Sequence, residues 1–316
     1  MPVPDASNGR GVAVLIPCYN EEVTIRKVVD DFRRALPAAT IYVFDNNSRD
    51  RTAAIAREAG ALVVPSPRQG KGHVVRHMFA SVEAEAYLMV DGDDTYPADQ
   101  AERLLEAFRS GGVDMVVGAR IERSEAGAFR RFHRFRNHLV ARLIASLFRV
   151  PATDVMSGYR VFSRDFVKSI PLLSSGFEIE TEMTLQAAAK GYVFREVPTD
   201  YGKRPEGSLS KLNTYSDGFL VLRTILLIFK DYKPLVFFTV LAVLFSLLSV
   251  AAGWGPVQDY VTTGFVPRFP RAILAAALGI LAGISLGVGL ILDTLAKFQR
   301  EQFELWRRHF SRPPDA

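Results

Sequence analysis

A group of carboxylates follows the short apolar run Leu88–Val90 and offers the clearest chemistry in the chain. Asp91, Asp93 and Asp94 come directly after this run. Apolar runs this short, bounded by turn residues, are typical of buried strands. In open α/β sheets, ligands bind just beyond the carboxyl ends of such strands. Asp91 and Asp93 can therefore direct carboxylates at a hard cation such as Mg²⁺ that carries substrate phosphates. An acidic turn that only solvates a strand end accounts for the same pattern.

The elements that must position these acids alternate along the chain. Because short apolar runs alternate with helical segments, we expect an α/β fold with a mainly parallel sheet and helices on both faces. Asn20 is the expected N-cap of the first helix, since Asn is favoured there. The expected strands are Val12–Ile16, Ile41–Phe44, Ala61–Val64, Leu88–Val90, Met115–Val117 and Tyr192–Val197.

Asp45 directly follows the second expected strand, as Asp91 follows the fourth. In a parallel sheet both residues lie at the same edge, and a nucleotide is the natural occupant between them. Asp45 would accept hydrogen bonds from its base or ribose, and a metal at Asp91 and Asp93 would hold its diphosphate. The chain has neither GxGxxG after the first strand nor a Walker A lysine, which disfavours a redox enzyme or an ATPase. Gly70-Lys71-Gly72 alone is more often a helix entry than a phosphate loop.

Charge and composition limit the class of partner. The chain has 316 residues, a formal net charge of +5 and a pI of about 9.3, which suits a partner with phosphates or an anionic membrane surface. It has no helix-turn-helix, zinc-finger or RNA-recognition signature, so we expect no nucleic-acid partner. Cys18 is the one cysteine, so no disulfide framework is expected. Residues 1–11 are polar and lack the apolar core of a signal peptide.

Five motifs in order make the chain resemble a family 2 glycosyltransferase of the GT-A fold, and more narrowly the dolichyl- or polyprenyl-phosphate sugar synthases. The resemblance covers about residues 11–215. It implies that Pro17, Tyr19, Glu21 and Asp45 hold a nucleotide-diphosphate sugar, with Lys71, Asp154 and Lys211 also on the donor. It further implies Mg²⁺ or Mn²⁺ on Asp91 and Asp93, with Thr95, where some relatives have glutamine, as the third ligand. The motifs are PCYNE (17–21), DNNSRDRT (45–52), GKG (70–72), DGDDTYP (91–97) and SGYRVF (157–162).

The segment Arg120–Arg149 is rich in arginine, and its later apolar residues recur at helical spacing. Such a segment is typical of an interfacial helix with arginines toward lipid phosphates; an ordinary solvated basic face is the alternative. Arg120, just after a strand, is best placed to bind an acceptor phosphate through its guanidinium fork. The resemblance implies that a loop arginine joins it: Arg130, Arg131 or Arg134.

Two further segments return to the expected site. The resemblance places Asp154–Phe162 on the sugar and acceptor side. Phe177–Glu182 opens a helix with acids at its positive end, and capping alone explains one or two of those glutamates. The basic, Gly/Pro/Ser-rich stretch 201–211 resembles the family's closing loop, in which Arg204, Ser208 and Lys211 meet diphosphate or acceptor phosphate. A charged linker to a membrane is the other interpretation.

The C-terminal third carries the membrane signals. Leu235–Val257 and Ala272–Leu292 contain no charge, and each exceeds the ~20 residues that cross a bilayer as a helix. With Gln258–Arg271 as the connection they form a hairpin, and the Lys/Arg bias at its ends places both termini in the cytoplasm. We expect an interfacial helix at 216–233 and a cytoplasmic amphipathic helix at Lys297–Phe310. The expected domains are 1–215 (catalytic), 216–233, 234–296 (hairpin) and 297–316.

Three glycines repeat every four residues along the second span: Gly279, Gly283 and Gly287. Such a ridge permits close helix packing. It would act inside one hairpin or between the subunits of a homo-oligomer.

Together with the resemblance, these parts predict metal-dependent transfer of a sugar from a GDP- or UDP-sugar to a polyprenyl or dolichyl monophosphate, with Asp93, Arg120, Arg131 and Arg204 as catalytic residues. The resemblance implies that the transfer is a single displacement with inversion. One alternative is a lipid-alcohol acceptor such as diacylglycerol, which would need a carboxylate base, Asp154 or Glu180. A processive polysaccharide synthase is rejected because Gln302–Trp306 lacks the arginine of QxxRW. A membrane-anchored adaptor is disfavoured because the acids Asp45, Asp91 and Asp93 are present.

Overall fold

The computed structural model describes residues 11–121, 153–205, 207 and 214–310. The chain divides into two compact units, Met1–Ile225 and Leu226–Ala316, and the division falls within helix α8 (Thr214–Tyr232).

A seven-stranded sheet forms the centre of the first unit, with strand order β3-β2-β1-β4-β6-β5-β7. All neighbouring pairs are parallel except those of β6, which runs antiparallel to β4 and β5. The expected mainly parallel α/β fold is confirmed, while β6 is a strand that the sequence did not predict. The strands are β1 (Val12–Cys18), β2 (Thr40–Asp45), β3 (Leu62–Pro65), β4 (Ala86–Met89), β5 (Met115–Ile121), β6 (Arg160–Ser163) and β7 (Phe194–Asp200).

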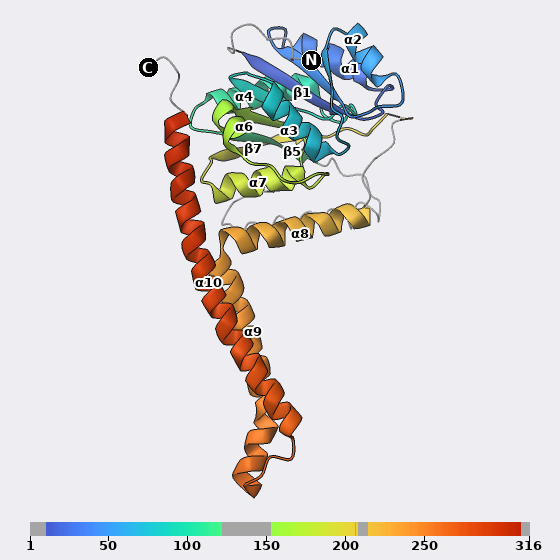
Figure 1. The fold of residues 1–316 in the computed structure, drawn as a ribbon. Helices are drawn as coiled ribbons and strands as arrows, with labels where there is room; N and C mark the ends of the chain where they lie inside the picture. The colour runs from blue at the N-terminus through green and yellow to red at the C-terminus, as the bar shows by residue number, and fades with distance from the viewer. Residues whose placement is uncertain (1–10, 122–152, 206, 208–213, 311–316) are drawn as a thin grey trace. The chain divides into compact units, whose positions relative to one another are not determined.

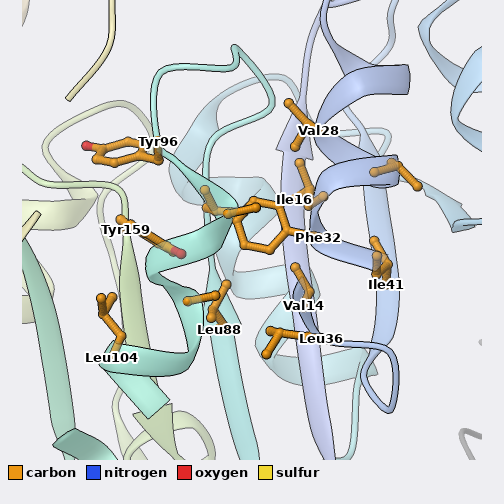
Figure 2. Close-up of a cluster of buried hydrophobic side chains, with 14 of the residues drawn as sticks. Val14, Ile16, Val28, Phe32, Leu36, Ile41, Leu88, Tyr96, Leu104 and Tyr159 are labelled. Carbon is orange, nitrogen blue, oxygen red and sulfur yellow. The ribbon is translucent and has the colours of Figure 1, made fainter. Parts of the chain in front are cut away.

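Helices cover both faces of the sheet, with α1 and α2 on one side and α3 and α7 on the other (Figure 1). The face under α1 is packed because Ile25, Val28, Val29 and Phe32 recur at helical spacing and are all buried. Figure 2 shows Phe32 among the strand side chains of this core, and its ring meets Tyr159 edge-on, with centroids 6.1 Å apart. The helices of this unit are α1 (Ile25–Ala35), α2 (Thr52–Glu58), α3 (Lys71–Ser81), α4 (Ala101–Arg109), α6 (Arg164–Ser169) and α7 (Ile179–Ala189), with a 3₁₀ turn, η2 (Ala98–Gln100).

The prediction that Asn20 caps the first helix is wrong. Helix α1 begins at Ile25, and Asn20 has a φ of 52°, in the left-handed region that Asn tolerates. The side-chain Oδ1 of Asn20 accepts from the backbone amide of Arg49 at 2.8 Å, and the backbone amide of Asn20 donates to Ser48 Oγ at 2.9 Å. Asn20 therefore ties the turn after β1 to the turn after β2, because its short polar side chain bonds to the backbone outside a helix.

The second unit contains a hairpin of two long helices, α9 (Pro234–Thr263) and α10 (Phe269–Phe310). Both are long and apolar enough to cross a membrane, as the sequence predicted. The helices extend further than expected, because α9 continues through Pro256 to Thr263 and α10 continues past Leu292 to Phe310. The connection is therefore shorter than Gln258–Arg271, and Lys297–Phe310 continues α10 instead of forming a separate helix. Gly264 ends α9 with a φ of 72°, and its amide donates to the Tyr260 carbonyl.

Small residues bring α9 and α10 together, but they are mostly not those of the expected ridge. A Cβ on Gly289 would lie 2.8 Å from the Cβ of Phe238, whereas one on Gly283 or Gly287 would meet nothing within 4 Å. Ser249 Oγ donates to the Ala275 carbonyl at 2.7 Å between the helices. The prediction that Gly283 and Gly287 pack inside the hairpin is therefore wrong. Their role between subunits stays a prediction.

A pair of alanine substitutions tests this packing. Alanine gains about 1 kcal/mol of helix propensity over glycine. At Gly289 the added methyl overlaps Phe238, and overpacking costs about 1–3 kcal/mol. We expect Gly289→Ala to lower the Tm of the detergent-solubilised chain and Gly283→Ala to leave it unchanged or raise it. Equal responses would contradict the register of the two helices.

Candidate functional site

The candidate site lies beyond the carboxyl ends of β1 and β4, where the strand order reverses. This reversal is the position at which open α/β sheets bind ligands. A pocket of about 270 Å³ opens there. It brings together seven residues predicted from the sequence: Pro17, Tyr19, Glu21, Lys71, Asp91, Asp93 and Arg204. Among the lining residues that the sequence did not single out are Asn46, Gln69 and Phe177.

Lys71 bridges two carboxylates at the inner wall of this pocket. Its Nζ lies 2.5 Å from Asp91 Oδ1 and 2.6 Å from Glu180 Oε1. Burial acts to lower the pKa of Lys71, but the charges and hydrogen bonds of the two carboxylates outweigh it and hold that pKa well above its ordinary value. Lys71 is thus a cation at neutral pH. As the first residue of α3 it fits both interpretations of Gly70-Lys71-Gly72, a helix entry and a wall of the pocket.

Asp93 is buried and oriented by its own turn. Its Oδ1 accepts from the hydroxyl of Thr95 at 2.6 Å, and its Oδ2 lies 2.5 Å from Arg204 Nη2. Thr95 is also buried, so the structure places it as the residue that orients Asp93. Its role as a metal ligand stays a prediction. Asp94 points away from the pocket residues, and its Oδ1 lies 2.6 Å from Lys27 Nζ on α1.

Close backbone contacts hold the acidic turn in place. A Cβ on Gly92 would lie 2.6 Å from Cys18 Sγ, and one on Gly158 would lie 2.4 Å from Asp91 Oδ2. Thr24 Oγ1 donates to the Gly92 carbonyl at 2.7 Å. The Gly158 amide donates to Tyr96 Oη at 3.0 Å. The backbone of the SGYRVF motif thus packs directly against Asp91.

Asn46 lines the pocket and holds the segment that leads into α3. Its Nδ2 donates to the carbonyls of Ser66 and Arg68, and its Oδ1 accepts from the Gly70 amide at 2.8 Å. The signal for this role was a polar residue directly after the strand that ends at Asp45. Asp45 itself is outside the pocket lining, and its Oδ1 is buried with no hydrogen-bond partner within the described segments. Such an orphaned acceptor is suited to a ligand donor.

Arg120 and Asp154 form a two-pronged ion pair beside the pocket. Arg120 Nε lies 2.7 Å from Asp154 Oδ2, and Nη2 lies 2.8 Å from Oδ1. The guanidinium also lies over the Tyr201 ring, 5.3 Å from its centroid. Burial acts to raise the pKa of Asp154, but the hydrogen bonds and charge of Arg120 outweigh it and hold that pKa below its ordinary value. Neither residue lines the pocket, and their substrate roles stay predictions.

Five predicted residues lie outside the described part of the chain: Arg130, Arg131, Arg134, Ser208 and Lys211. So does most of the expected basic amphipathic segment. The structure therefore tests none of these assignments.

The carboxylates at the pocket fit a divalent cation whose remaining ligands come from a substrate. The described residues contain no group of three or more His, Cys, Asp or Glu side chains arranged to hold a metal. They do offer Asp91 and Asp93, two carboxylates at the pocket, each paired with a basic side chain. Mg²⁺ is commonly bound by one or two carboxylates together with substrate phosphates. The residues present are consistent with that arrangement.

Comparison with known proteins assigns the family. The model of glycosyl transferase family 2 matches residues 13–170, and the chain belongs to this family. It is 35% identical over 309 residues to "Glycosyltransferase AglJ" of Haloferax volcanii, covering 96% of this chain and 98% of that protein. It is 30% identical over 214 residues to "Dolichyl-phosphate hexose transferase" of the same organism, covering 68% of this chain and 92% of that one.

Solved structures confirm the fold. Glucosyl-3-phosphoglycerate synthase from Mycobacterium tuberculosis, in complex with Mn²⁺, UDP and glucosyl-3-phosphoglycerate, superposes with a TM-score of 0.58 at 22% identity. The match covers 70% of this chain and 80% of that one. The first unit therefore has the GT-A fold that the sequence predicted.

Gly158→Ala tests the close contact with Asp91. Because the new methyl would overlap Oδ2, the carboxylate must move, and misplacement by about 1 Å can cost about 10²-fold in rate. We expect sugar transfer to fall by that order while the Tm changes little. A variant with wild-type turnover would show that the position of Asp91 has no part in the reaction.

Proposed function

We propose that the chain transfers a sugar from a GDP- or UDP-sugar to a polyprenyl or dolichyl monophosphate. The observation that carries the proposal is the state of the acids around the pocket. A hydroxyl acceptor would need a carboxylate base, with Asp154 and Glu180 as the candidates. Asp154 is held by Arg120, and Glu180 is buried against Lys71. A phosphate acceptor needs no base, because it is already anionic at neutral pH.

The pKa of Asp154 supports this choice. General bases work best when their pKa lies near the working pH, whereas Arg120 holds the pKa of Asp154 below its ordinary value. Glu180 is 3% exposed and does not line the pocket, so an acceptor hydroxyl in the pocket would not reach it. A lipid alcohol is therefore the less favoured acceptor.

The reaction is a single displacement with inversion. An oxygen of the acceptor phosphate forms a bond to the anomeric carbon, and the bond from that carbon to the donor's diphosphate breaks. Pro17, Tyr19, Glu21 and Asp45 hold the nucleotide, and Asp154 and Lys211 hold the donor sugar and phosphates. Asp91 and Asp93 hold Mg²⁺ or Mn²⁺, which supplies positive charge to the leaving diphosphate. Lys71 and Arg204 add their charges on the same side, so catalysis rests on positioning and charge neutralisation.

The acceptor phosphate is bound by arginines and by Ser208. Arg120 keeps its orientation through Asp154, and one of Arg130, Arg131 and Arg134 supplies further positive charge. Guanidinium groups suit this task because they bind phosphate oxygens through two parallel hydrogen bonds. The name of the Haloferax volcanii dolichyl-phosphate hexose transferase supports the acceptor class. The Mn²⁺ and UDP of the mycobacterial complex support the cofactor and the donor.

The hairpin anchors the enzyme where its acceptor resides. Helices α9 and α10 span the membrane, and helix α8 lies at the interface. Basic residues are more numerous at the open end of the hairpin than at its connection, which supports a cytoplasmic location for the catalytic unit and both termini. The open face at Gly283 and Gly287 is the contact surface of a homo-oligomer.

Neighbouring aspartates provide a matched test of the metal site. Asp93→Asn keeps the size of the side chain and the acceptor for Thr95 but loses the charge, so we expect transfer to fall by about 10²-fold or more. Asp94→Asn should retain activity, because Asp94 pairs with Lys27 and its φ of 59° suits Asn. Turnover of radiolabelled donor in membranes with and without Mn²⁺ measures both. If Asp93→Asn turns over the donor as fast as the wild type, Asp93 is not a metal ligand.

The acceptor is tested by supplying purified enzyme with radiolabelled GDP- and UDP-sugars and one lipid at a time. With polyprenyl phosphate, we expect a solvent-extractable product that mild acid hydrolyses, formed only with a divalent metal. Diacylglycerol is the matched alternative acceptor. If the label appears instead in an acid-stable glycolipid, the acceptor is a lipid alcohol and the proposed phosphate acceptor is wrong.

A further inference from the structure

Three glutamates stand at the start of α7, and two of them serve the loop before it. Glu182 accepts from the amides of Leu173 and Ser174 at 2.9 and 2.8 Å. Glu178 accepts from the amides of Ser175 and Gly176, both at 3.0 Å. These two glutamates therefore hold the loop that precedes α7, and the capping role expected from the sequence is not seen, since the N-cap residue Glu178 makes no side-chain capping bond. Glu180 is different, because its carboxylate lies 2.6 Å from Lys71 Nζ.

The two carboxylates that share Lys71 differ in access. The Asp91 side chain is 24% exposed and lines the pocket, whereas that of Glu180 is 4% exposed and lies behind Lys71. A divalent ion entering from the pocket therefore reaches Asp91 and not Glu180. Lys71 contacts Oδ1 of Asp91, and Oδ2 lies against the backbone of Gly158, so an ion that binds Oδ1 would displace Lys71 from Asp91.

Lys71 keeps a partner after that displacement. A buried ammonium without a counter-ion is strongly unfavourable, and Glu180 stays within ion-pair distance. The Phe177 ring, 5.6 Å from Nζ, adds a cation–π contact on a further side. Glu180 and Phe177 together would thus hold the ammonium at the pocket wall if Asp91 bound a metal.

We infer that Glu180 is a positioning residue, which holds Lys71 toward the donor's diphosphate once a divalent ion occupies Asp91. The inference rests on the proposed function for the identity of the donor. Without Glu180, Lys71 has Asp91 as its remaining carboxylate and competes with the metal for it. Glu180 acts through Lys71 and does not touch the substrate.

A double-mutant cycle tests this dependence by calorimetric titration of the full-length protein in detergent with UDP and with GDP, each with Mn²⁺. We expect Glu180→Gln to weaken binding of the diphosphate about tenfold, a typical coupling for contacting residues. In a Lys71→Met background the same substitution should cause no further loss. Binding of UMP and GMP without metal should be the same for wild type and Glu180→Gln.

Glu182→Gln is the structural control on the same helix. It removes charge from the loop contacts, so its effects on Tm and binding should be equal with and without Lys71. If Glu180→Gln does not fold, Glu180→Asp provides the same comparison, with a smaller loss expected because the charge is kept.

The outcomes separate this inference from the proposed function. Suppose that the wild-type protein binds a nucleoside diphosphate. If Glu180→Gln does not weaken this binding, or weakens it equally in the Lys71→Met background, the positioning role alone is overturned. An equal loss for mono- and diphosphates also overturns it, since the effect would then be structural. A wild-type protein that binds neither UDP nor GDP with Mn²⁺ overturns both. If the double-mutant cycle shows the expected dependence on Lys71 but the enzyme does not transfer sugar to polyprenyl phosphate, the positioning role of Glu180 is supported and the proposed acceptor is wrong.

Discussion

Negative charge gathered where β1 and β4 end is the constraint on which the site depends. Asp91, Asp93 and Glu180 are all largely removed from solvent, and buried carboxylates are tolerated only with partners. The partners come from distant elements: Lys71 begins α3, and Arg204 follows β7. Their pairing therefore links four segments of the chain at one site: the turn after β4, the start of α3, helix α7 and the stretch after β7. The described contacts set two cations against three carboxylates, so the site retains affinity for additional positive charge.

The backbone around this charge is built for close approach. Strand β6 runs antiparallel beside β4 and places Gly158 against Asp91, where a side chain would not fit. Arg160, fully buried, holds the segment before it by donating to the carbonyls of Val155 and Ser157, both at 2.8 Å. It also donates to Thr184 on α7 at 2.9 Å. One buried arginine thus connects the segment that packs on Asp91 with the helix that supplies Glu180.

Much of this arrangement could be predicted from the sequence, because its signals are local. Apolar runs ending in Asp45 and Asp91 located two strand ends and the edge of the sheet, and the ordered motifs indicated the family. The errors and omissions concern contacts that depend on the folded chain. Asn20 resembles an N-cap locally, but it bonds to a turn 28 and 29 residues away. Strand β6 is short, and it lies within the SGYRVF motif, which was interpreted as part of the site and not as a strand. The pairing of Glu180 with Lys71 joins residues more than one hundred positions apart in the sequence.

The contacts that the acids already make also bear on the kind of acceptor that suits the site. Glu178 and Glu182 bond to backbone amides, Asp154 pairs with Arg120, and Glu180 lies behind Lys71. Within the described segments, the acids that line the pocket are Glu21, Asp91 and Asp93, and the last two pair with Lys71 and Arg204. A site arranged in this way favours a nucleophile that is already charged. A lipid phosphate, the acceptor proposed above, would supply such a nucleophile without the help of a base.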